Sequence, residues 1–212
     1  MKTDSTLIVT PDSSLLSGVI CLIRNHFGEV TSPRDDDPIY DAFEHHFQTS
    51  GKQMRASLSL DVSRALCLDS HTAQCLAACV EALHNASLVL DDFQDSALER
   101  RGQPTVYALF GRDVALGLTL RLTTTAFVSL SQIKKVEHLG SLTKEVHQAV
   151  ADTILGQTWD LDDTKNEAVE QVKLTASMKS GPLFGLSVSL PLLAAGHKAA
   201  LESARRIGKL FG

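Results

Sequence analysis

The sequence contains little of what marks several classes of protein. Only 5% of its 212 residues are aromatic and 21% are charged, and its 20 Lys and Arg residues are outnumbered by 25 Asp and Glu residues. The deficit of basic residues argues against a nucleic-acid-binding protein, which usually carries a basic surplus. Intrinsic disorder is excluded because 43% of the residues are hydrophobic and the formal net charge is only −5. We therefore expect a folded globular protein with one core.

Long hydrophobic runs are also missing. No uninterrupted apolar segment reaches the roughly 18 residues of a transmembrane helix. The best candidate, 183–195, is interrupted by Ser187, Ser189 and Pro191. The N-terminal segment MKTDSTLIVTPDSS has too short an apolar patch for a signal peptide and no small-residue cleavage site. The sequence thus predicts a cytoplasmic protein without a membrane span.

Cysteine is scarce and shows no pattern typical of a metal site or a disulfide framework. Cys21, Cys67, Cys75 and Cys79 include no CxxC pair and no Cys/His zinc spacing. On a helix, Cys75 and Cys79 would share one face among alanines and leucines. We expect these two to be small buried residues rather than redox or metal-binding groups.

Helical periodicity is present almost throughout. Apolar residues recur every three or four positions, and breaks fall where proline, glycine or aspartate cluster. Only TLIVT at 6–10 is typical of a strand. The sequence predicts a single all-α domain covering 1–212. The first expected helix begins at a cap near residue 13, the helix at 70–95 is expected to be capped by the Ser70 hydroxyl, and the other expected helices cover 38–48, 52–67, 113–131, 142–159, 167–179, 183–194 and 198–211.

The most informative segment is HNASLVLDDFQD at 84–95. On a helical wheel, His84, Asp91 and Asp95 lie within about 40° of each other, and Asp92 reaches the same rim. Like charges one turn apart destabilise a helix unless a cation neutralises them. Carboxylate oxygens at this spacing suit Mg²⁺, which keeps several waters and takes further ligands from substrate phosphates. The alternative is a solvated acidic helix end, but the preceding apolar run indicates a buried helix.

Two cationic groups accompany the acidic cluster. Arg100 and Arg101 follow it after a short turn, and their planar guanidinium groups can bind phosphate oxygens in a bidentate way. Lys52 and Arg55 are three positions apart at an expected helix start, where both charges and the free backbone N–H groups can face one anion. Each pair alone is a common surface feature. Together they predict two anion sites around one metal site, as a reaction between two phosphorylated substrates requires.

These elements, in this order, resemble the trans-type isoprenyl diphosphate synthases, also called polyprenyl synthetases. The matching segments are GKQMR, HNASLVLDDFQDSALERRGQPT, GQTWDL and KSGPLF, and the resemblance extends from residue 51 to the C-terminus. It implies an antiparallel helical bundle around a central cavity, generally as a homodimer. It also implies a prenyltransferase that uses Mg²⁺ to condense isopentenyl diphosphate with an allylic diphosphate into a longer linear isoprenyl diphosphate.

The resemblance also implies a role for each matching residue. The family's first aspartate-rich motif, which holds Mg²⁺ on the allylic diphosphate, corresponds to Asp91, Asp92 and Asp95. Catalysis would depend on Asp91, Asp92 and Lys179. The residues expected on the allylic side are Arg100, Gln157, Lys179 and Ser180. The residues expected to bind isopentenyl diphosphate are Lys52, Arg55, His84 and Arg101.

Product length in the family depends on the bulk of the residues just before the first aspartate-rich motif. Ala86 and Ser87, five and four positions before Asp91, are both small. They imply an open cavity floor and a product longer than farnesyl.

The sequence departs most from the family near its C-terminal end. The family has a second aspartate-rich motif opposite the first, and LESARRIGKLFG at 201–212 resembles only the approach to it. We expect the natural chain to continue past Gly212, so that this domain lacks its C-terminal part. The aspartates of WDLDD at 159–163 are interpreted as a helix end rather than as a substitute motif.

Two other functions remain open from the sequence. A non-catalytic, diphosphate-binding or regulatory subunit of a heteromeric prenyl synthase would need only half a metal site. A terpene synthase of related fold would ionise an allylic diphosphate without isopentenyl diphosphate. The segment GKQMR and Arg101 argue against the terpene synthase, because an enzyme with one substrate needs no second diphosphate site.

Overall fold

Helices make up nearly all of the chain that the computed structural model describes, which is residues 13–29, 36–49, 51–134, 136–162 and 168–211. The expected strand at 6–10 and Asp163 lie outside these residues. The all-α prediction is confirmed. The helices are α1 (Ser13–Glu29), α2 (Pro38–Gln48), α3 (Met54–Ala65), α4 (Ser70–Gln94), α5 (Val106–Ser131), α6 (Val136–Asp160), α7 (Val169–Ala194) and α8 (Leu201–Phe211), with a 3₁₀ turn at Lys198–Ala200.

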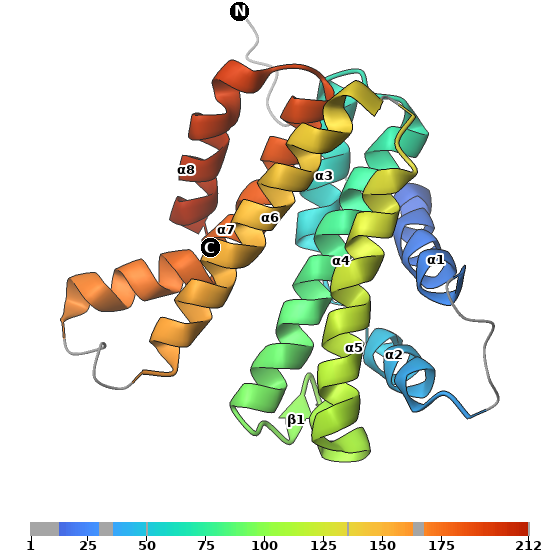
Figure 1. Cartoon of the computed structure of the whole chain (residues 1–212), viewed down its shortest axis with the longest axis vertical. Helices are drawn as coiled ribbons and strands as arrows, with labels where there is room; N and C mark the ends of the chain where they lie inside the picture. Colours follow the sequence, from blue (N-terminus) through green and yellow to red (C-terminus); the bar gives the residue numbers. More distant parts are fainter. Residues whose placement is uncertain (1–12, 30–35, 50, 135, 163–167, 212) are drawn as a thin grey trace, which may run out of the picture.

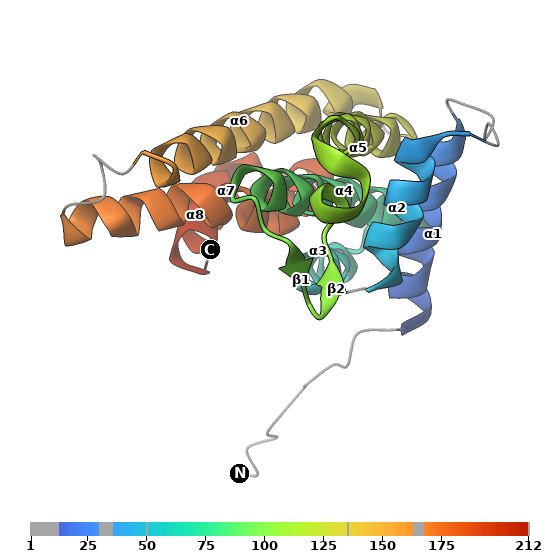
Figure 2. The same cartoon turned by 90° about the horizontal axis from the view of Figure 1, so that it is seen from below.

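Helix α4 lies at the centre of the bundle. It packs along α5, while α3 covers another side and α1 contacts both α4 and α5 (Figure 1). The view from below shows α2 beside α1 at one edge and α6 with α7 at the other (Figure 2). The α7 helix contacts α3 and α4 and carries α8 on its outer side. The functional residues predicted on α3, α4 and α7 are therefore brought together by packing in the bundle.

Helices α4 and α5 are both long and apolar enough to cross a membrane by length and composition, although neither contains the uninterrupted apolar run sought in the sequence. The most apolar window of α4 is 72% buried inside the bundle, and that of α5 is 44% buried. Cys75 and Cys79, both completely buried on α4, belong to this core as predicted. Burial raises the pKa of the Cys75 thiol to about 11, which keeps it protonated and unreactive at neutral pH. The composition of α4 thus reflects its position in the protein core.

The starts of α2 and α4 follow local capping rules, but the cap of α4 differs from the one predicted. Helix α2 begins at Pro38 as predicted, and the Asp37 side chain accepts hydrogen bonds from two backbone N–H groups of its first turn. Helix α4 begins at Ser70 as predicted, but its cap is Asp69 and not the Ser70 hydroxyl. The Asp69 carboxylate accepts from the backbone N–H of Thr72 at 2.9 Å and from its hydroxyl at 2.7 Å. These bonds hold the pKa of Asp69 below its usual value.

Three helices are longer than the sequence predicts, and one of them is α6, which begins at Val136 rather than at residue 142. Helix α5 begins at Val106, capped by Thr105, and continues across a kink at Gly111, where φ is 81°. Helix α7 is continuous where two helices were expected, with Pro182 and Pro191 inside it. A proline in a helix removes one backbone hydrogen bond. In α7 this loss is outweighed by packing against α6 on one side and α8 on the other.

A short hairpin after α4 was not predicted. Strands β1 (Glu99–Arg100) and β2 (Gln103–Pro104) pair antiparallel, with Glu99 opposite Pro104. The turn residues Arg101 and Gly102 have φ values of 55° and 75°. Positive φ at both central residues is the signature of the tight turns that join twisted strands. This hairpin determines where the two arginines point.

Candidate active site

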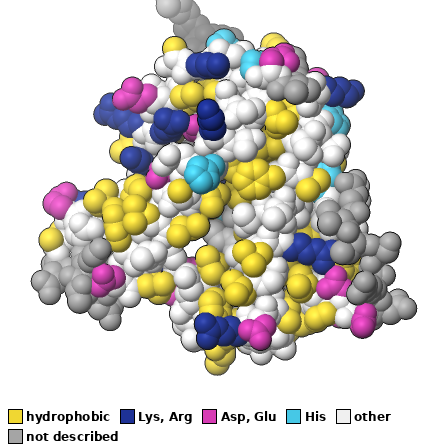
Figure 3. All heavy atoms as spheres, in the orientation of Figure 1, with side chains coloured by type: hydrophobic (Ala, Val, Ile, Leu, Met, Phe, Trp, Pro, Cys, Tyr) yellow, Lys and Arg dark blue, Asp and Glu magenta, His cyan; other side chains and the backbone are white. Residues whose placement is uncertain are grey.

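An apolar cavity of about 340 Å³ lies between α4, α5, α6 and α7. The two small residues expected at its floor, Ala86 and Ser87, both line it. Its outer wall is formed by Leu116 and Leu120 of α5 and Ile154 of α6, which are 43%, 60% and 54% exposed. Figure 3 shows this face of the molecule hollowed, with hydrophobic side chains on both sides. The cavity suits the hydrocarbon tail of an amphiphilic ligand.

A group of paired charges lies where α4 and α6 end beside this cavity. Lys179 of α7 places its Nζ 2.8 Å from Oδ1 of Asp91 and 2.7 Å from Oδ2 of Asp160. From the hairpin, Arg100 Nε donates to both oxygens of Asp92 at 2.8 and 2.9 Å, and its Nη2 lies 3.3 Å from Asp91. The short turn thus folds Arg100 back over Asp91 and Asp92.

The environment raises the pKa values of two members of this group, for different reasons. Burial raises the pKa of Asp92, against the opposing effect of Arg100. Burial also disfavours the charged form of Lys179, but the hydrogen bonds to Asp160 and Asp91 outweigh it and raise the pKa of Lys179. The lysine is therefore a permanent cation at neutral pH. In the absence of a ligand, the two basic side chains compensate the acidic charge of α4.

The three aspartates of the predicted metal motif differ in their surroundings. Asp91 is half-buried, Asp92 is 4% exposed, and Asp95 is exposed as the C-cap residue of α4. Within the described ranges, no group of three or more His, Cys, Asp or Glu side chains is arranged to hold a metal ion. Carboxylate oxygens on successive turns are nevertheless the donors that Mg²⁺ prefers. The donor chemistry fits Mg²⁺, while the carboxylates of Asp91 and Asp92 are held by basic side chains.

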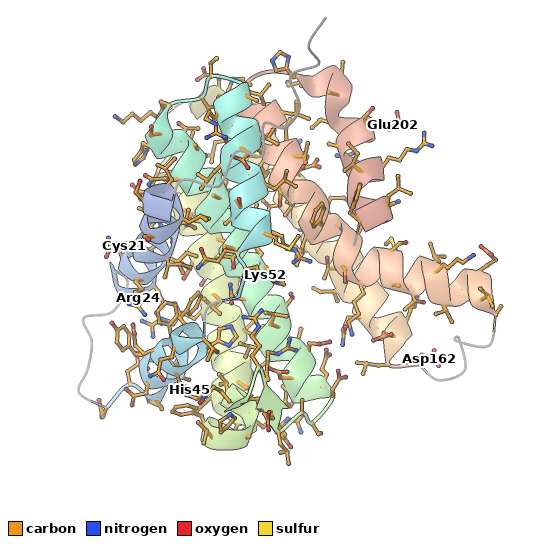
Figure 4. All side chains as sticks on the ribbon, turned by 180° about the vertical axis from the view of Figure 1, so that it is seen from behind. Cys21, Arg24, His45, Lys52, Asp162 and Glu202 are labelled. Atoms are coloured by element: carbon orange, nitrogen blue, oxygen red, sulfur yellow. The ribbon has the colours of Figure 1, made fainter. Side chains whose placement is uncertain are left out.

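A second cavity, of about 570 Å³, lies on the other side of α4. It brings together the four residues expected to bind isopentenyl diphosphate, and Figure 4 shows Lys52 beside the start of α3. Arg55 Nη1 lies 3.3 Å from His84 Nε2. Burial and then the charge of Arg55 lower the pKa of His84 to about 3, so this imidazole is neutral and accepts from Arg55. Within the described part of the chain, Lys52, Arg55 and Arg101 form no ion pair with a carboxylate.

The consecutive arginines of the hairpin point to different sites because Arg100 ends strand β1, whereas Arg101 is a turn residue with a φ of 55°. Arg100 turns toward α4, whereas Arg101 turns toward the segment between α2 and α3 and donates to the carbonyl of Thr49 at 3.2 Å. Its guanidinium lies directly over Gly51, where an added Cβ would be 2.5 Å from Nη2. A side chain at this position would therefore push the Arg101 guanidinium out of its present place.

The remaining predicted residues also lie at the first cavity. Gln157 and Ser180 line it, and Gln157 is 7% exposed with an Nε2 that has no hydrogen-bond partner among the described residues. Sequence reasoning missed two polar residues beside the second cavity, Glu81 and Asn85. The signal that could have revealed Glu81 is a charged residue inside the apolar run AACVEAL.

These features define a protein with two groups of basic side chains around a buried helix, one of them beside an apolar cavity and an acidic cluster. The sequence model of the polyprenyl synthetase family matches residues 36–212. The chain belongs to this family, as the resemblance indicated.

Known relatives agree with this assignment. The chain is 30% identical over 186 residues to a short chain isoprenyl diphosphate synthase of Methanocaldococcus jannaschii, covering 83% of this chain and 56% of the relative. It is 31% identical over 172 residues to a (2E,6E)-farnesyl diphosphate synthase of Mycobacterium tuberculosis, covering 76% of this chain and 46% of the relative. The chain spans about half the length of these curated relatives.

Solved structures share the fold. The geranylgeranyl pyrophosphate synthetase of Pyrococcus horikoshii Ot3 superposes with a TM-score of 0.78 at 27% identity, covering 94% of this chain and 64% of that one. The all-α bundle of the isoprenoid synthase type is therefore confirmed by both sequence and structure.

Proposed function

We propose that this chain is a trans-prenyltransferase that condenses isopentenyl diphosphate with an allylic diphosphate to give a longer linear isoprenyl diphosphate. The observation that carries the proposal is that the two cavities adjoin each other. Arg55, His84 and Leu88 line both the apolar cavity and the second, cationic one. Two substrates bound in these adjoining cavities would have their reactive carbons close together, as bond formation between them requires.

In this proposal the chain's basic residues bind and stabilise the leaving diphosphate. Arg100 and Lys179 take the diphosphate of the allylic substrate, whose tail occupies the apolar cavity. Asp91 and Asp95 would hold Mg²⁺, which when bound neutralises charge that builds on the departing group. The C–O bond breaks to give an allylic cation, and apolar walls protect the cation from water.

The second substrate then forms the new carbon–carbon bond. Lys52, Arg55 and Arg101 hold the diphosphate of isopentenyl diphosphate, and its double bond attacks the allylic cation. The released diphosphate takes the proton that is lost, because the described residues of the site include no evident side-chain base. Atoms balance with one elongated diphosphate and one free diphosphate as products.

Asp92 has a different proposed task from its neighbours. Both its oxygens bind Arg100 Nε, and it is nearly fully buried. A carboxylate held in this way orients a guanidinium group firmly. We assign Asp92 to positioning Arg100 on the allylic diphosphate and leave the metal to Asp91 and Asp95.

The family also supports a homodimer located in the cytoplasm. Leu109 and Phe127 of α5 are 54% and 36% exposed and offer apolar surface for such a contact. A regulatory subunit is not favoured, because the relatives described above carry the names of synthases. A terpene synthase is not favoured either, because it has no use for the second cationic cavity.

The direct test is product analysis with isopentenyl diphosphate and farnesyl diphosphate in the presence of Mg²⁺. A product five carbons longer than the allylic substrate supports the proposal, and the absence of any elongated product from folded protein refutes it.

Replacing Ala86 with Phe is expected to shorten the product. Ala86 is 3% exposed and lines the apolar cavity, so a phenyl ring there would fill the space into which the tail grows. Chromatography of the dephosphorylated products from wild type and variant measures the effect. Leu98→Phe, a change on a residue that is 70% exposed, is the matched control and should leave product length unchanged. An unchanged product from Ala86→Phe would contradict the assignment of this cavity to the tail.

A further inference from the structure

A buried chain of polar side chains connects α2 to α4 behind the second cavity. The Nε2 of His46 lies 2.9 Å from Oδ1 of Asn85. The Nδ2 of Asn85 in turn donates to Oε1 of Glu81 at 3.2 Å and to the Glu81 carbonyl at 2.8 Å. Asn85 and Glu81 are only 8% and 5% exposed. Buried groups linked in this way fix one another's orientation, because each lost bond leaves an unsatisfied polar atom.

The hydrogen bonds all run in one direction. The amide nitrogen of Asn85 faces the oxygens of Glu81, so its carbonyl oxygen must face His46. A carbonyl only accepts, and His46 therefore carries its proton on Nε2 and donates. Burial lowers the pKa of His46 to about 4, and the nearby charges of Arg100 and Arg101 also disfavour its protonation, so the ring is neutral at neutral pH. His46 thus donates to Asn85, and Asn85 donates to the Glu81 carboxylate.

Glu81 faces the first turn of α3. Burial raises its pKa, while Asn85, the charge of Arg55 and the backbone N–H of Ala56 favour the carboxylate. Helix α3 needs such a partner, because its N-cap residue Gln53 has a φ of 46° and makes no side-chain capping bond. Glu81 lines the second cavity together with Gln53 and Arg55 at this helix start, and its buried Oε2 has no hydrogen-bond partner among the described residues.

The Glu81 carboxylate favours the positive charge of Arg55 but does not occupy its guanidinium group. Glu81 favours the charged form of Arg55 electrostatically, against the burial that lowers the arginine's pKa. The described contacts include no ion pair between the two, and Arg55 Nε has no hydrogen-bond partner among the described residues. Arg55 Nη1 donates to His84, and the guanidinium group also lines the second cavity, where it can meet an anion.

We propose that His46 is a positioning residue for the second anion site, acting through Asn85 and Glu81 on Arg55 and the first turn of α3. His46 does not line the second cavity itself. The identity of the anion, isopentenyl diphosphate, rests on the proposed function, whereas the geometry does not.

The test compares His46→Leu with His46→Gln by titration calorimetry of inorganic pyrophosphate without Mg²⁺. Under these conditions the cations of the second cavity are free, whereas Lys179 and Arg100 are paired with aspartates. His46→Leu should raise the Kd about tenfold, which corresponds to about 1.4 kcal/mol. His46→Gln should stay within about twofold of wild type, because its amide can donate to Asn85 as the imidazole does.

Steady-state kinetics adds a readout that a merely structural role would not move. In His46→Leu the KM for isopentenyl diphosphate should rise by a similar factor, with the KM for the allylic diphosphate and kcat nearly unchanged. Far-UV circular dichroism verifies the fold, and Asn85→Ala, with the same expected rise in Kd, replaces His46→Leu if that variant fails to fold.

Wild-type pyrophosphate affinity in a folded His46→Leu or Asn85→Ala variant would overturn the inference, and so would a His46→Gln variant as defective as His46→Leu. A wild-type chain that makes no elongated product, but whose pyrophosphate affinity depends on His46 as stated, would refute the proposed function and support the inference.

Discussion

Replacing Asp91 with Asn is expected to lower the rate of product formation about 10²- to 10³-fold, the usual cost of removing one preorganised electrostatic group from an active site. The Asp91 carboxylate contacts Lys179 at 2.8 Å and Arg100 at 3.3 Å beside the apolar cavity. Asparagine keeps the shape but removes the negative charge that holds these cations, and it replaces one of the two oxygens proposed to bind Mg²⁺ with an amide nitrogen. Measuring kcat over a range of Mg²⁺ concentrations checks the prediction.

Asp61→Asn is the matched control for this change. Asp61 forms an ion pair with Arg64 on the solvent side of α3, with side chains 39% and 52% exposed. Exposed pairs contribute at most about 1 kcal/mol, so this variant should keep wild-type kinetics. A wild-type rate in a folded Asp91→Asn variant would remove the acidic cluster from the mechanism.

Replacing Gly156 with Ala is expected to destabilise the protein by about 1–3 kcal/mol, the usual cost of overpacking a close contact. A Cβ at Gly156 would lie 2.4 Å from the backbone nitrogen of Lys179 and from the backbone carbon of Met178. Backbone cannot move aside as a side-chain tip can, so α6 and α7 would have to separate. Lys179 and Gln157 would move with them, and activity should fall as well. Thermal unfolding followed by circular dichroism measures the stability change, at about 2–4 °C per kcal/mol.

Gly140→Ala provides a control on the same helix. A Cβ at Gly140 would meet nothing within 4 Å, and the residue is exposed. Alanine there should stabilise the protein by about 0.4–1 kcal/mol, because it restricts the unfolded chain and suits a helix. If both substitutions shifted the unfolding temperature equally, the close approach of α6 to α7 would not be the reason for Gly156.

Local features of the fold could be predicted from the sequence because they depend on neighbouring residues. The starts of α2 at Pro38 and α4 at Ser70 follow from proline and capping preferences that act over a few positions. The continuity of α7 through Pro182 could not be predicted, because it depends on packing against helices distant in the sequence. The first turns of α5 were not predicted either, because the kink at Gly111 separates them from the rest of the helix.

In the candidate site, too, contacts between residues close in sequence could be predicted, whereas contacts between distant residues could not. The wheel position of Asp91 and the short turn before Arg100 are sufficient to predict that these two side chains meet. The hydrogen bond between His46 and Asn85 joins residues 39 positions apart and leaves no trace in spacing or composition. The opposite directions of Arg100 and Arg101 required the unpredicted hairpin. The sequence therefore predicts the candidate reactive groups, and the tertiary structure shows which residues hold them.

The measurement that tests the account most directly is mass spectrometry of the products formed from deuterated isopentenyl diphosphate, unlabelled farnesyl diphosphate and Mg²⁺. Condensation by this chain would give a diphosphate that contains the farnesyl carbons and at least one deuterated five-carbon unit, and no such product when Mg²⁺ is chelated. Farnesyl diphosphate recovered unchanged, or converted to products without deuterium, would contradict condensation as the function of this chain.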